Sequence, residues 1–261
     1  MPRSWRSAHP ISPAVDVAGA DETGTDMAEL RPTSAAAVDP LTGLATTRAI
    51  RRYADEPVPD DDLSAILWHA SRAPSGSNRQ PFRFLVLRDG PKARSAKSML
   101  GRSFRRGWAA KQTADGYTTS VAADPTSPKA RTAATMQHYV DHLEQVPVVV
   151  LVCLERYRDP NPFEGASVYP ACQNLLLAAR ALGWGGALTM WHQAVEPELR
   201  GLLSIPDHVA LSACITLGRP VGRHGPVRRR PIGDLVFDDE WANSAGWAVD
   251  PPGTRHTHWR G

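Results

Sequence analysis

The sequence predicts a layered fold of helices and strands, of the α/β or α+β class, in one large domain. Two continuous apolar runs, at 147–155 and 209–218, have the length and composition of buried strands. A strongly apolar helix is expected between them, at 169–182. Because the helices are long and the strands few, the elements do not alternate regularly. This order favours a layered sandwich over a series of βαβ units.

The first part of the domain is expected to be a helix followed by a strand. Asp60, Asp61 and Asp62 suit the first turn of a helix, and apolar residues follow them at helical spacing. We expect this helix to end at Pro74, because the residue before a proline avoids the helical conformation. The run FRFLVLRDG at 82–90 predicts a strand with a turn after it.

The middle of the domain is expected to contain a long loop. Residues 112–129 are rich in Thr, Ala, Asp, Ser and Pro, and long loops of this kind are often lids or binding loops. A helix is expected to resume near Thr132. Gly183 is placed to end the apolar helix, and residues 196–203 predict a short further helix.

The N-terminal segment differs in composition from this domain. Residues 1–40 are rich in Ala, Ser, Thr, Asp and Pro and show no apolar period, which predicts a mobile tail. The domain itself is expected at 41–261, with a C-terminal extension from about residue 232.

Composition limits the partners and the compartment. The formal net charge of +3 and the sequence pI of about 8.9 favour an anionic ligand. No apolar run approaches the ~20 residues that span a bilayer, and no signal-like segment is present, so we expect a cytoplasmic protein with no membrane partner. Widely spaced cysteines without a CxxC pair predict buried free thiols. They are Cys153, Cys172 and Cys214.

Two clusters of arginine are candidates for binding a phosphate group. Arg48, Arg51 and Arg52 lie within five residues, and arginine offers a rigid fork of donors that matches phosphate oxygens. On a helix, Arg48 and Arg51 would share a face. The second cluster, at 228–230, could converge with the first on one phosphate. Taken alone, the first cluster is better explained as a solvated basic turn, and the second could be a solvated basic loop or a nucleic-acid patch.

Between these clusters lie two segments that suit a flat ligand. APSGSNRQPF, at 73–82, presents the amides of Asn78 and Gln80, which both donate and accept hydrogen bonds, as the edge of a flavin ring requires. GWGGALTMWH, at 183–192, has three glycines in four residues, which would let the backbone approach a flat ligand closely. Each segment could also be a plain connection between elements.

No set of residues predicts a catalytic triad or a metal site. His138 and His142 are four apart on an expected helix, but no carboxylate or cysteine completes a set of metal ligands. Ser75 lacks the GxSxG elbow of many hydrolases. The glycines of 183–192 follow a helix rather than a strand, so they do not match a Rossmann site.

Taken in their order along the chain, the four segments resemble the nitroreductase family of FMN enzymes. The resemblance covers about 41–231 and rests chiefly on the string APSGSNRQPF. It implies an α+β fold, with a mixed sheet flanked by helices, in an obligate homodimer that holds two FMN molecules at its interface. It also implies that N5 of the flavin carries the hydride, so no catalytic side chain and no metal are expected.

The resemblance further implies which residues contact the cofactor. The N-terminal basic motif supplies Arg48, Ala49 and Arg51, and Ala49 stands where the family often has a serine hydroxyl. We expect Trp191 and His192 to line the substrate pocket, with 112–129 as a partial lid; the alternative is that Trp191 is a core residue and His192 a polar neighbour whose hydrogen bonds are satisfied. The remaining expected FMN contacts are Pro74, Ser75, Asn78, Gln80, Leu188, Thr189, Met190 and Arg229.

Together these features predict an FMN-dependent oxidoreductase. It would take hydride from NADH or NADPH and pass it to nitroaromatics, quinones or a similar small-molecule acceptor by a ping-pong mechanism. The same fold could instead serve flavin fragmentation, reductive dehalogenation or flavin storage. A basic nucleic-acid-binding protein that uses Trp108 and Trp184 is the alternative from another class, but it leaves the segment 73–82 unexplained, so no nucleic-acid partner is expected.

Overall fold

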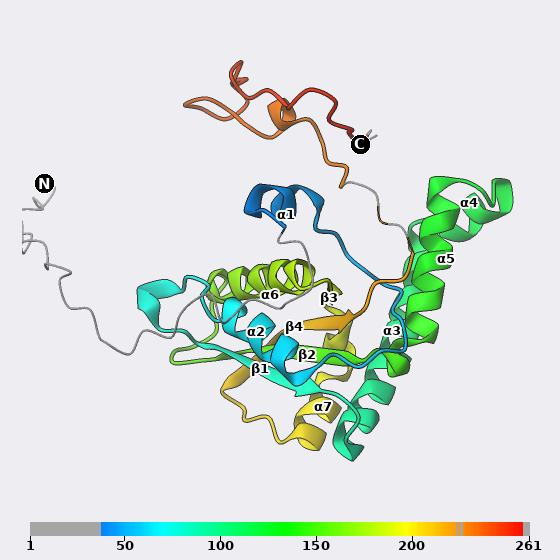
Figure 1. Ribbon diagram of the computed structural model, residues 1–261, viewed down its shortest axis with the longest axis vertical. Coiled ribbons are helices and arrows are strands. Elements are labelled where there is room, and N and C mark those ends of the chain that lie inside the picture. The colour runs from blue at the N-terminus through cyan, green and yellow to red at the C-terminus, as the bar shows by residue number, and fades with distance from the viewer. Residues whose placement is uncertain (1–37, 223, 225–226, 258–261) are drawn as a thin grey trace, which may run out of the picture. The chain divides into compact units, whose positions relative to one another are not determined.

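The computed structural model describes residues 38–222, 224 and 227–257, and its central feature is a four-stranded sheet (Figure 1). The strand order is β1-β2-β4-β3. The expected α+β class is therefore confirmed. The strands are β1 (Phe82–Leu87), β2 (Val148–Glu155), β3 (Gly185–Thr189) and β4 (Val209–Gly218).

Neighbouring strands in the described part of the chain are all antiparallel, rather than of mixed direction as expected. The connections from β1 to β2 and from β3 to β4 each begin and end at the same end of the sheet. Antiparallel neighbours require such connections, whereas parallel neighbours need a crossover to the opposite end.

Strand β2 separates two hydrophobic cores, because successive side chains of a strand point to opposite faces of the sheet. Val149 and Leu151 belong to one core, and Val150 and Val152 belong to the other. All four side chains are fully buried. This burial on both faces explains why the strand is a continuous apolar run in the sequence.

One face of the sheet is covered by the long helix α3 and its neighbours. Leu100, Phe104 and Trp108 are four residues apart on α3, and all three are buried in this core. The helices on this side are α3 (Pro91–Ala114), α4 (Tyr117–Ala123), α5 (Pro128–Asp141) and α7 (Glu196–Leu203).

The other face is covered by two helices that lie side by side (Figure 1), α2 (Asp60–Ala70) and α6 (Tyr169–Ala181). A short helix, α1 (Pro40–Thr46), contacts α6. The predicted apolar helix is thus confirmed. It ends as expected, because Gly183 adopts a positive φ of 80° that side-chain-bearing residues disfavour. Helix α2 ends at Ala70, four residues before Pro74, so the expected stop at the proline is wrong.

Short 3-10 helices complete the regular structure. They are η1 (Gly76–Asn78), η2 (Leu143–Gln145), η3 (Glu164–Ser167), η4 (Trp191–Val195) and η5 (Ile232–Asp234).

The predicted long loop at 112–129 is mostly helical. Helix α3 continues to Ala114, and α4 occupies the centre of the segment. Helix α5 begins at Pro128, earlier than expected, because proline suits the first turn and the Ser127 hydroxyl accepts a hydrogen bond from the Ala130 N–H at 3.1 Å. Only the turns around Gly116 and at 124–127 separate the helices. A lid of irregular loop is therefore not present here.

The segment 183–192 contains the edge strand β3 rather than a turn. Its glycines allow the protein, not a ligand, to approach closely. A Cβ on Gly185 would lie 2.6 Å from Cγ1 of Ile50, and a Cβ on Gly186 would lie 2.7 Å from the Thr216 carbonyl oxygen. A five-residue strand that begins with two glycines has weak strand propensity, so the sequence did not predict it.

The ends of the chain are described in part. The predicted tail at 1–40 lies outside the described residues except for its last three. In the predicted C-terminal extension, Phe237 bridges Ser244, and Arg229 bridges His256. Trp241 and Trp247 are strongly exposed there. No helix in the described part of the chain is long and apolar enough to cross a membrane.

Candidate functional site

The first basic cluster lies on an extended segment beside the edge strand β3. The Ile50 N–H donates to the Gly186 carbonyl at 2.8 Å, and Tyr53 forms a bridge with Pro220 just beyond β4. Helix α1 ends at Thr46, so residues 47–52 are not helical. The expectation that Arg48 and Arg51 share a helix face is therefore wrong, because backbone bonds to β3 replace helical bonds.

A buried hydroxyl network holds this segment from beneath. The Tyr53 hydroxyl donates to the Ile50 carbonyl at 2.5 Å and lies 2.8 Å from Oγ1 of Thr216. The Tyr139 hydroxyl lies 2.9 Å from the same Thr216 oxygen. Burial raises the pKa of both tyrosines, so they stay neutral donors. The network fixes the backbone that carries the arginines.

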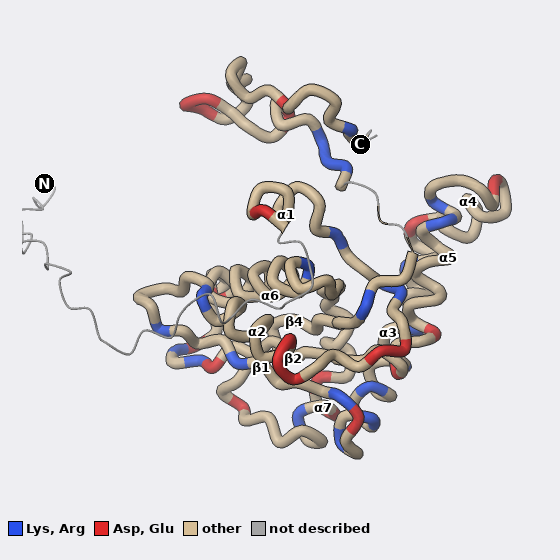
Figure 2. The backbone as a smooth tube through the Cα atoms, viewed as in Figure 1, with Lys and Arg blue, Asp and Glu red and all other residues tan. Residues whose placement is uncertain are grey.

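Positive charge gathers around this segment (Figure 2). Partial burial and then the nearby Arg48 lower the pKa of His224. Burial, His142 and Arg52 lower the pKa of His138 in the same way. Among the described residues, no carboxylate forms an ion pair with Arg51 or Arg52. The local field therefore suits an anion such as a phosphate group.

The second candidate segment is a strained loop that leads into β1. Ser77, Asn78 and Gln80 have positive φ values of 52°, 51° and 50°. Residues with a side chain adopt this conformation at a cost of roughly 1–3 kcal/mol each, and such strain is concentrated at functional sites. The Gln80 N–H donates to the Ser75 hydroxyl at 2.9 Å, and its side-chain amide donates to Oδ1 of Asn78 at 3.2 Å. These bonds present both exposed amides from one rigid loop.

The third candidate segment lies at the end of β3. Leu188 is exposed and lies on the same side of the strand as Gly186, whose position faces Leu176 of α6. Thr189 accepts a hydrogen bond on its hydroxyl from the Trp191 N–H at 3.3 Å. Met190 packs on the core on the α6 side of the sheet. The segment therefore borders an open edge on that side.

The strand order places the first two segments at diagonally opposite corners of the sheet. β1 and β3 are its two edge strands, three strand intervals apart. The loop 75–80 precedes Phe82, which is level with Leu154, whereas Gly186 is level with Val148 through Leu217. Spacings of ~4.8 Å between strands and ~3.3 Å per residue give a separation of roughly 24 Å between Phe82 and Gly186. One chain therefore does not bring Arg48 and Asn78 together.

The two residues expected in the substrate pocket differ in burial. Trp191 is partly buried, lies edge-on to Phe104 with ring centroids 5.6 Å apart, and accepts a hydrogen bond from Ser103 on its carbonyl at 2.6 Å. His192 is 0% exposed, and its Nε2 lies 3.1 Å from the Leu211 carbonyl. Burial lowers the pKa of His192. His192 is thus a core residue, and its expected place in a pocket wall is wrong because η4 turns it inward.

The last expected FMN contact, Arg229, lies in the C-terminal segment. Its side chain is exposed, and its carbonyl accepts a hydrogen bond from the Thr257 N–H at 2.8 Å. The role of Arg229 toward a phosphate stays a prediction.

Comparison with known proteins identifies the family. The model of the nitroreductase family matches residues 44–219, more than half of the chain. The chain belongs to the nitroreductase family. The match begins within α1 and ends just after β4, so it includes all four strands and the three candidate segments described above.

Relatives of this nitroreductase-family chain carry different names. A protein of Archaeoglobus fulgidus named as an NADH dehydrogenase/NAD(P)H nitroreductase is 28% identical over 182 residues, which is 67% of this chain and 82% of the relative. A 5,6-dimethylbenzimidazole synthase of Rhodospirillum rubrum is 26% identical and covers 68% of this chain and 80% of the synthase. The crystal structure of a protein from Desulfovibrio desulfuricans, named as a nitroreductase and in complex with FMN, is 26% identical with a TM-score of 0.56. It covers 77% of this chain and 96% of that one.

The alternative in which Trp108 and Trp184 of this family member stack on nucleic-acid bases is wrong. Trp184 is 2% exposed and donates from Nε1 to Asp62 at 2.7 Å, and the Arg219 guanidinium lies 3.8 Å from its ring centroid. Trp108 is 1% exposed and donates to Gln137 at 2.9 Å. Neither ring is available to stack on a base.

Sequence reasoning missed the residues that support the basic segment. Arg219 pairs with both carboxylate oxygens of Glu56 and donates to the Gly183 carbonyl. Tyr53 supports the Ile50 carbonyl, as described above. The sequence shows Tyr53 directly after the arginines, but the Thr216 hydroxyl that it also contacts is 163 residues away, so no local pattern could reveal its role.

The thiols are buried and unpaired, as the sequence predicts. Burial raises the pKa of Cys153 to about 11 and the pKa of Cys172 and Cys214 to about 12. They are therefore protonated and unreactive at neutral pH. Within the described residues, no group of three or more His, Cys, Asp or Glu side chains is arranged to hold a metal ion.

Proposed function

We propose that two copies of this FMN-type oxidoreductase form a homodimer in which each flavin site takes residues from both chains. The single observation that carries the proposal is the diagonal separation of Arg48 and Arg51 from Asn78 and Gln80 across the sheet. A two-fold axis would place the loop 75–80 of one copy opposite the basic segment of the other. The symmetry would create two such sites in each dimer. The FMN held by a relative of known structure supports the identity of the ligand.

The residues of this chain fit FMN. Arg48, Arg51 and Arg229 would hold the phosphate through charged hydrogen bonds, each contributing about 1.5–3 kcal/mol. The exposed amides of Asn78 and Gln80 would bond the edge of the ring, since they supply both donors and acceptors. The other proposed contacts, along the backbone and the faces of the ring, are Ala49, Pro74, Ser75, Leu188, Thr189 and Met190.

The chemistry needs no acid or base from the protein. When bound, FMN supplies the two-electron transfer between a nicotinamide donor and an acceptor. The protein binds and orients the ring and its partners. We propose that NADH or NADPH and the acceptor use the same face of the ring in turn, which gives ping-pong kinetics. Trp191 would stack on a planar acceptor such as a nitroaromatic or a quinone. Double-reciprocal plots of rate against donor concentration at several acceptor concentrations should give parallel lines. Intersecting lines would exclude a ring face that donor and acceptor share.

Three unpaired buried thiols support a reducing compartment, and we place the protein in the cytoplasm on that ground.

A second candidate is flavin fragmentation, because one relative is named 5,6-dimethylbenzimidazole synthase. The two candidates differ in the fate of the cofactor. A reductase returns its FMN after each cycle, whereas fragmentation consumes it. Incubation with NADPH under air, followed by quantification of intact FMN, separates them.

The phosphate assignment is tested by single substitutions. We expect about one FMN per chain in the purified protein. Arg48→Ala, Arg51→Ala and Arg229→Ala should each weaken FMN binding about tenfold to a hundredfold. Arg131→Ala, at an exposed arginine of α5, is the matched control and should keep full flavin. Full flavin in all three site variants after dialysis would show that the assignment is wrong.

The two-chain site is tested by complementation. Arg51→Ala and Asn78→Ala homodimers should each be poor in flavin. When the two chains are co-expressed, a mixed dimer has one site with both substitutions and one intact site, so random pairing restores about a quarter of the sites. A site built within one chain would show no restoration. Sedimentation of the wild-type protein as a monomer with full flavin would also exclude the dimer.

A further inference from the structure

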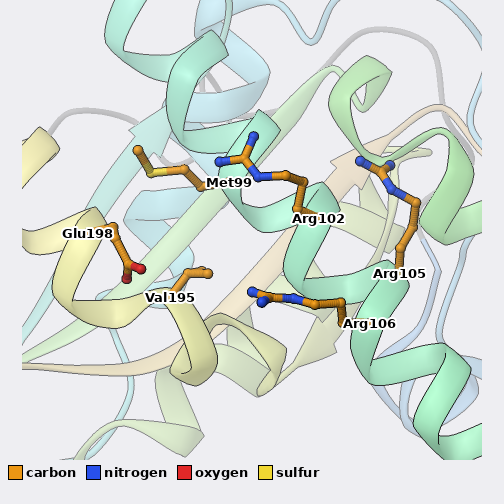
Figure 3. Close-up of a pocket in the computed structure, with 6 residues that line it drawn as sticks. All are labelled: Met99, Arg102, Arg105, Arg106, Val195 and Glu198. Atoms are coloured by element: carbon orange, nitrogen blue, oxygen red, sulfur yellow. The ribbon is translucent and has the colours of Figure 1, made fainter.

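A cavity of about 510 Å³ opens between α3 and the segment that runs from η4 into α7. Val195 and α7 belong to the core on the α3 side of the sheet, whereas Met190 packs on the core on the α6 side. No residue of the cavity's lining is among the FMN contacts proposed above. Its lining, shown in Figure 3, consists of Met99, Arg102, Arg105, Arg106, Val195 and Glu198.

The three arginines of the cavity differ in their partners. Arg105 donates to both carboxylate oxygens of Glu144, at 3.1 and 2.7 Å, and this pairing raises its pKa. Arg102 donates only to the Ser98 hydroxyl, at 3.0 Å. In the described part of the chain, neither Arg102 nor Arg106 has a carboxylate within ion-pair distance. Two cations of the cavity thus lack a counter-charge.

The two unpaired arginines lie on one face of the helix. Arg102 and Arg106 are four residues apart, and like charges at this spacing destabilise a helix. In Figure 3 the Arg106 side chain extends toward Val195, while Arg105 lies on the side of the helix away from Val195. An anion bound between Arg102 and Arg106 would relieve their repulsion and accept charged hydrogen bonds from both.

The rest of the lining limits the kind of anion. Met99 and Val195 supply apolar surface, and Val195 is itself buried. Glu198 of α7 lies across the cavity from the helix that carries the arginines (Figure 3), and its carboxylate offsets one of the two unpaired arginine charges. The lining therefore suits a single negative charge joined to an apolar body.

We propose that this cavity binds a small organic monoanion, a carboxylate with an apolar body, through Arg102 and Arg106. The site is independent of the flavin, because none of its residues belongs to the proposed FMN contacts.

Calorimetric titration of the purified, flavin-loaded protein with benzoate tests the proposal. We expect saturable binding of about one benzoate per chain. Arg102→Gln and Arg106→Gln should each weaken it about tenfold or more, whereas Arg106→Lys should keep most of the affinity. Glu198→Gln should tighten binding several-fold. Lys111→Gln changes a cation on the same helix that pairs with Asp115 outside the cavity, and it should leave affinity unchanged.

Several results would overturn the proposal. The first is the absence of saturable benzoate binding at millimolar concentration. The second is that the Arg102 and Arg106 variants bind benzoate with the same affinity as the wild-type protein. Tighter binding of inorganic phosphate than of benzoate would exclude an apolar monoanion. Circular dichroism and the flavin spectrum check that each variant is folded and loaded. Because flavin content is measured separately, failure of this site is distinguishable from failure of the FMN function.

Discussion

Replacing Gly186 with alanine tests how tightly the edge strand β3 is packed. Gly186 pairs with Leu217 of β4, and its carbonyl accepts the Ile50 N–H. A Cβ at this position would lie 2.7 Å from the Thr216 carbonyl oxygen and 2.8 Å from a methyl group of Leu176. Ordinary van der Waals contact begins at 3.4 Å, so β3 must move by several tenths of an ångström. The leucine can rotate, but the carbonyl belongs to the backbone of β4.

The expected cost follows from two opposing effects. Overpacking a core position typically costs about 1–3 kcal/mol. Alanine also restricts the unfolded chain, which stabilises by about 0.4–1 kcal/mol. We therefore expect Gly186→Ala to lower the free energy of unfolding by about 1–2 kcal/mol, which corresponds to a Tm decrease of roughly 2–8 °C. Because β3 carries Leu188 and Thr189, flavin content should fall as well.

The matched control is Gly201→Ala. Gly201 lies in α7, and nothing lies within 4 Å of the position of its Cβ. Alanine should raise the unfolding free energy there by about 0.8–1 kcal/mol through helix propensity. Both variants are compared by denaturant unfolding at equal flavin loading. If Gly186→Ala is as stable as the wild type while Gly201→Ala behaves as expected, the close approach of β3 to β4 is refuted.

Three further predictions concern the thiols, the acceptor pocket and the hydroxyl network. The unfolded chain releases thiol protons above pH ~9 that the folded chain retains up to its raised pKa, so stability should fall with rising pH by up to about 1.4 kcal/mol per pH unit for each thiol. In the Cys214→Ala variant the free energy of unfolding should decrease less steeply with pH. A slope equal to that of the wild type would contradict the burial of the Cys214 thiol. Trp191→Ala should raise the apparent KM for a nitroaromatic and leave flavin content unchanged; loss of flavin would instead assign Trp191 to the core. Tyr139→Phe removes one buried hydrogen bond to Thr216 and should cost about 0.5–1.5 kcal/mol, whereas Thr216→Val removes the shared partner of both tyrosines and should cost more in the same unfolding assay.

The sequence by itself determined the elements whose signals are local and strong. β2 and β4 are continuous apolar runs, and α6 is an apolar helix with Gly183 after it. These features follow from burial on both sides of a strand and from the freedom of glycine at positive φ, and neither depends on distant residues. The string at 73–82 likewise carried the family resemblance without any knowledge of the fold.

The sequence failed where local composition was ambiguous. Residues 112–129 have the composition of a loop, yet most of them are helical, and α5 begins there with the Ser127 cap and a proline in its first turn. The glycines of β3 suggested a ligand-binding turn, yet they are required by contacts with Ile50 and Thr216, which are distant in sequence. In both cases tertiary packing outweighed intrinsic propensity.

Only the tertiary structure decided where the candidate residues lie relative to one another. The sequence predicted that Arg48, Asn78 and Leu188 contact FMN. The strand order, however, places the basic segment and the amide loop at opposite corners of the sheet. The tertiary structure also buries Trp184 and His192 inside the protein. Strand order and side-chain burial depend on contacts between residues far apart in the chain, and a local pattern of residue types does not encode those contacts.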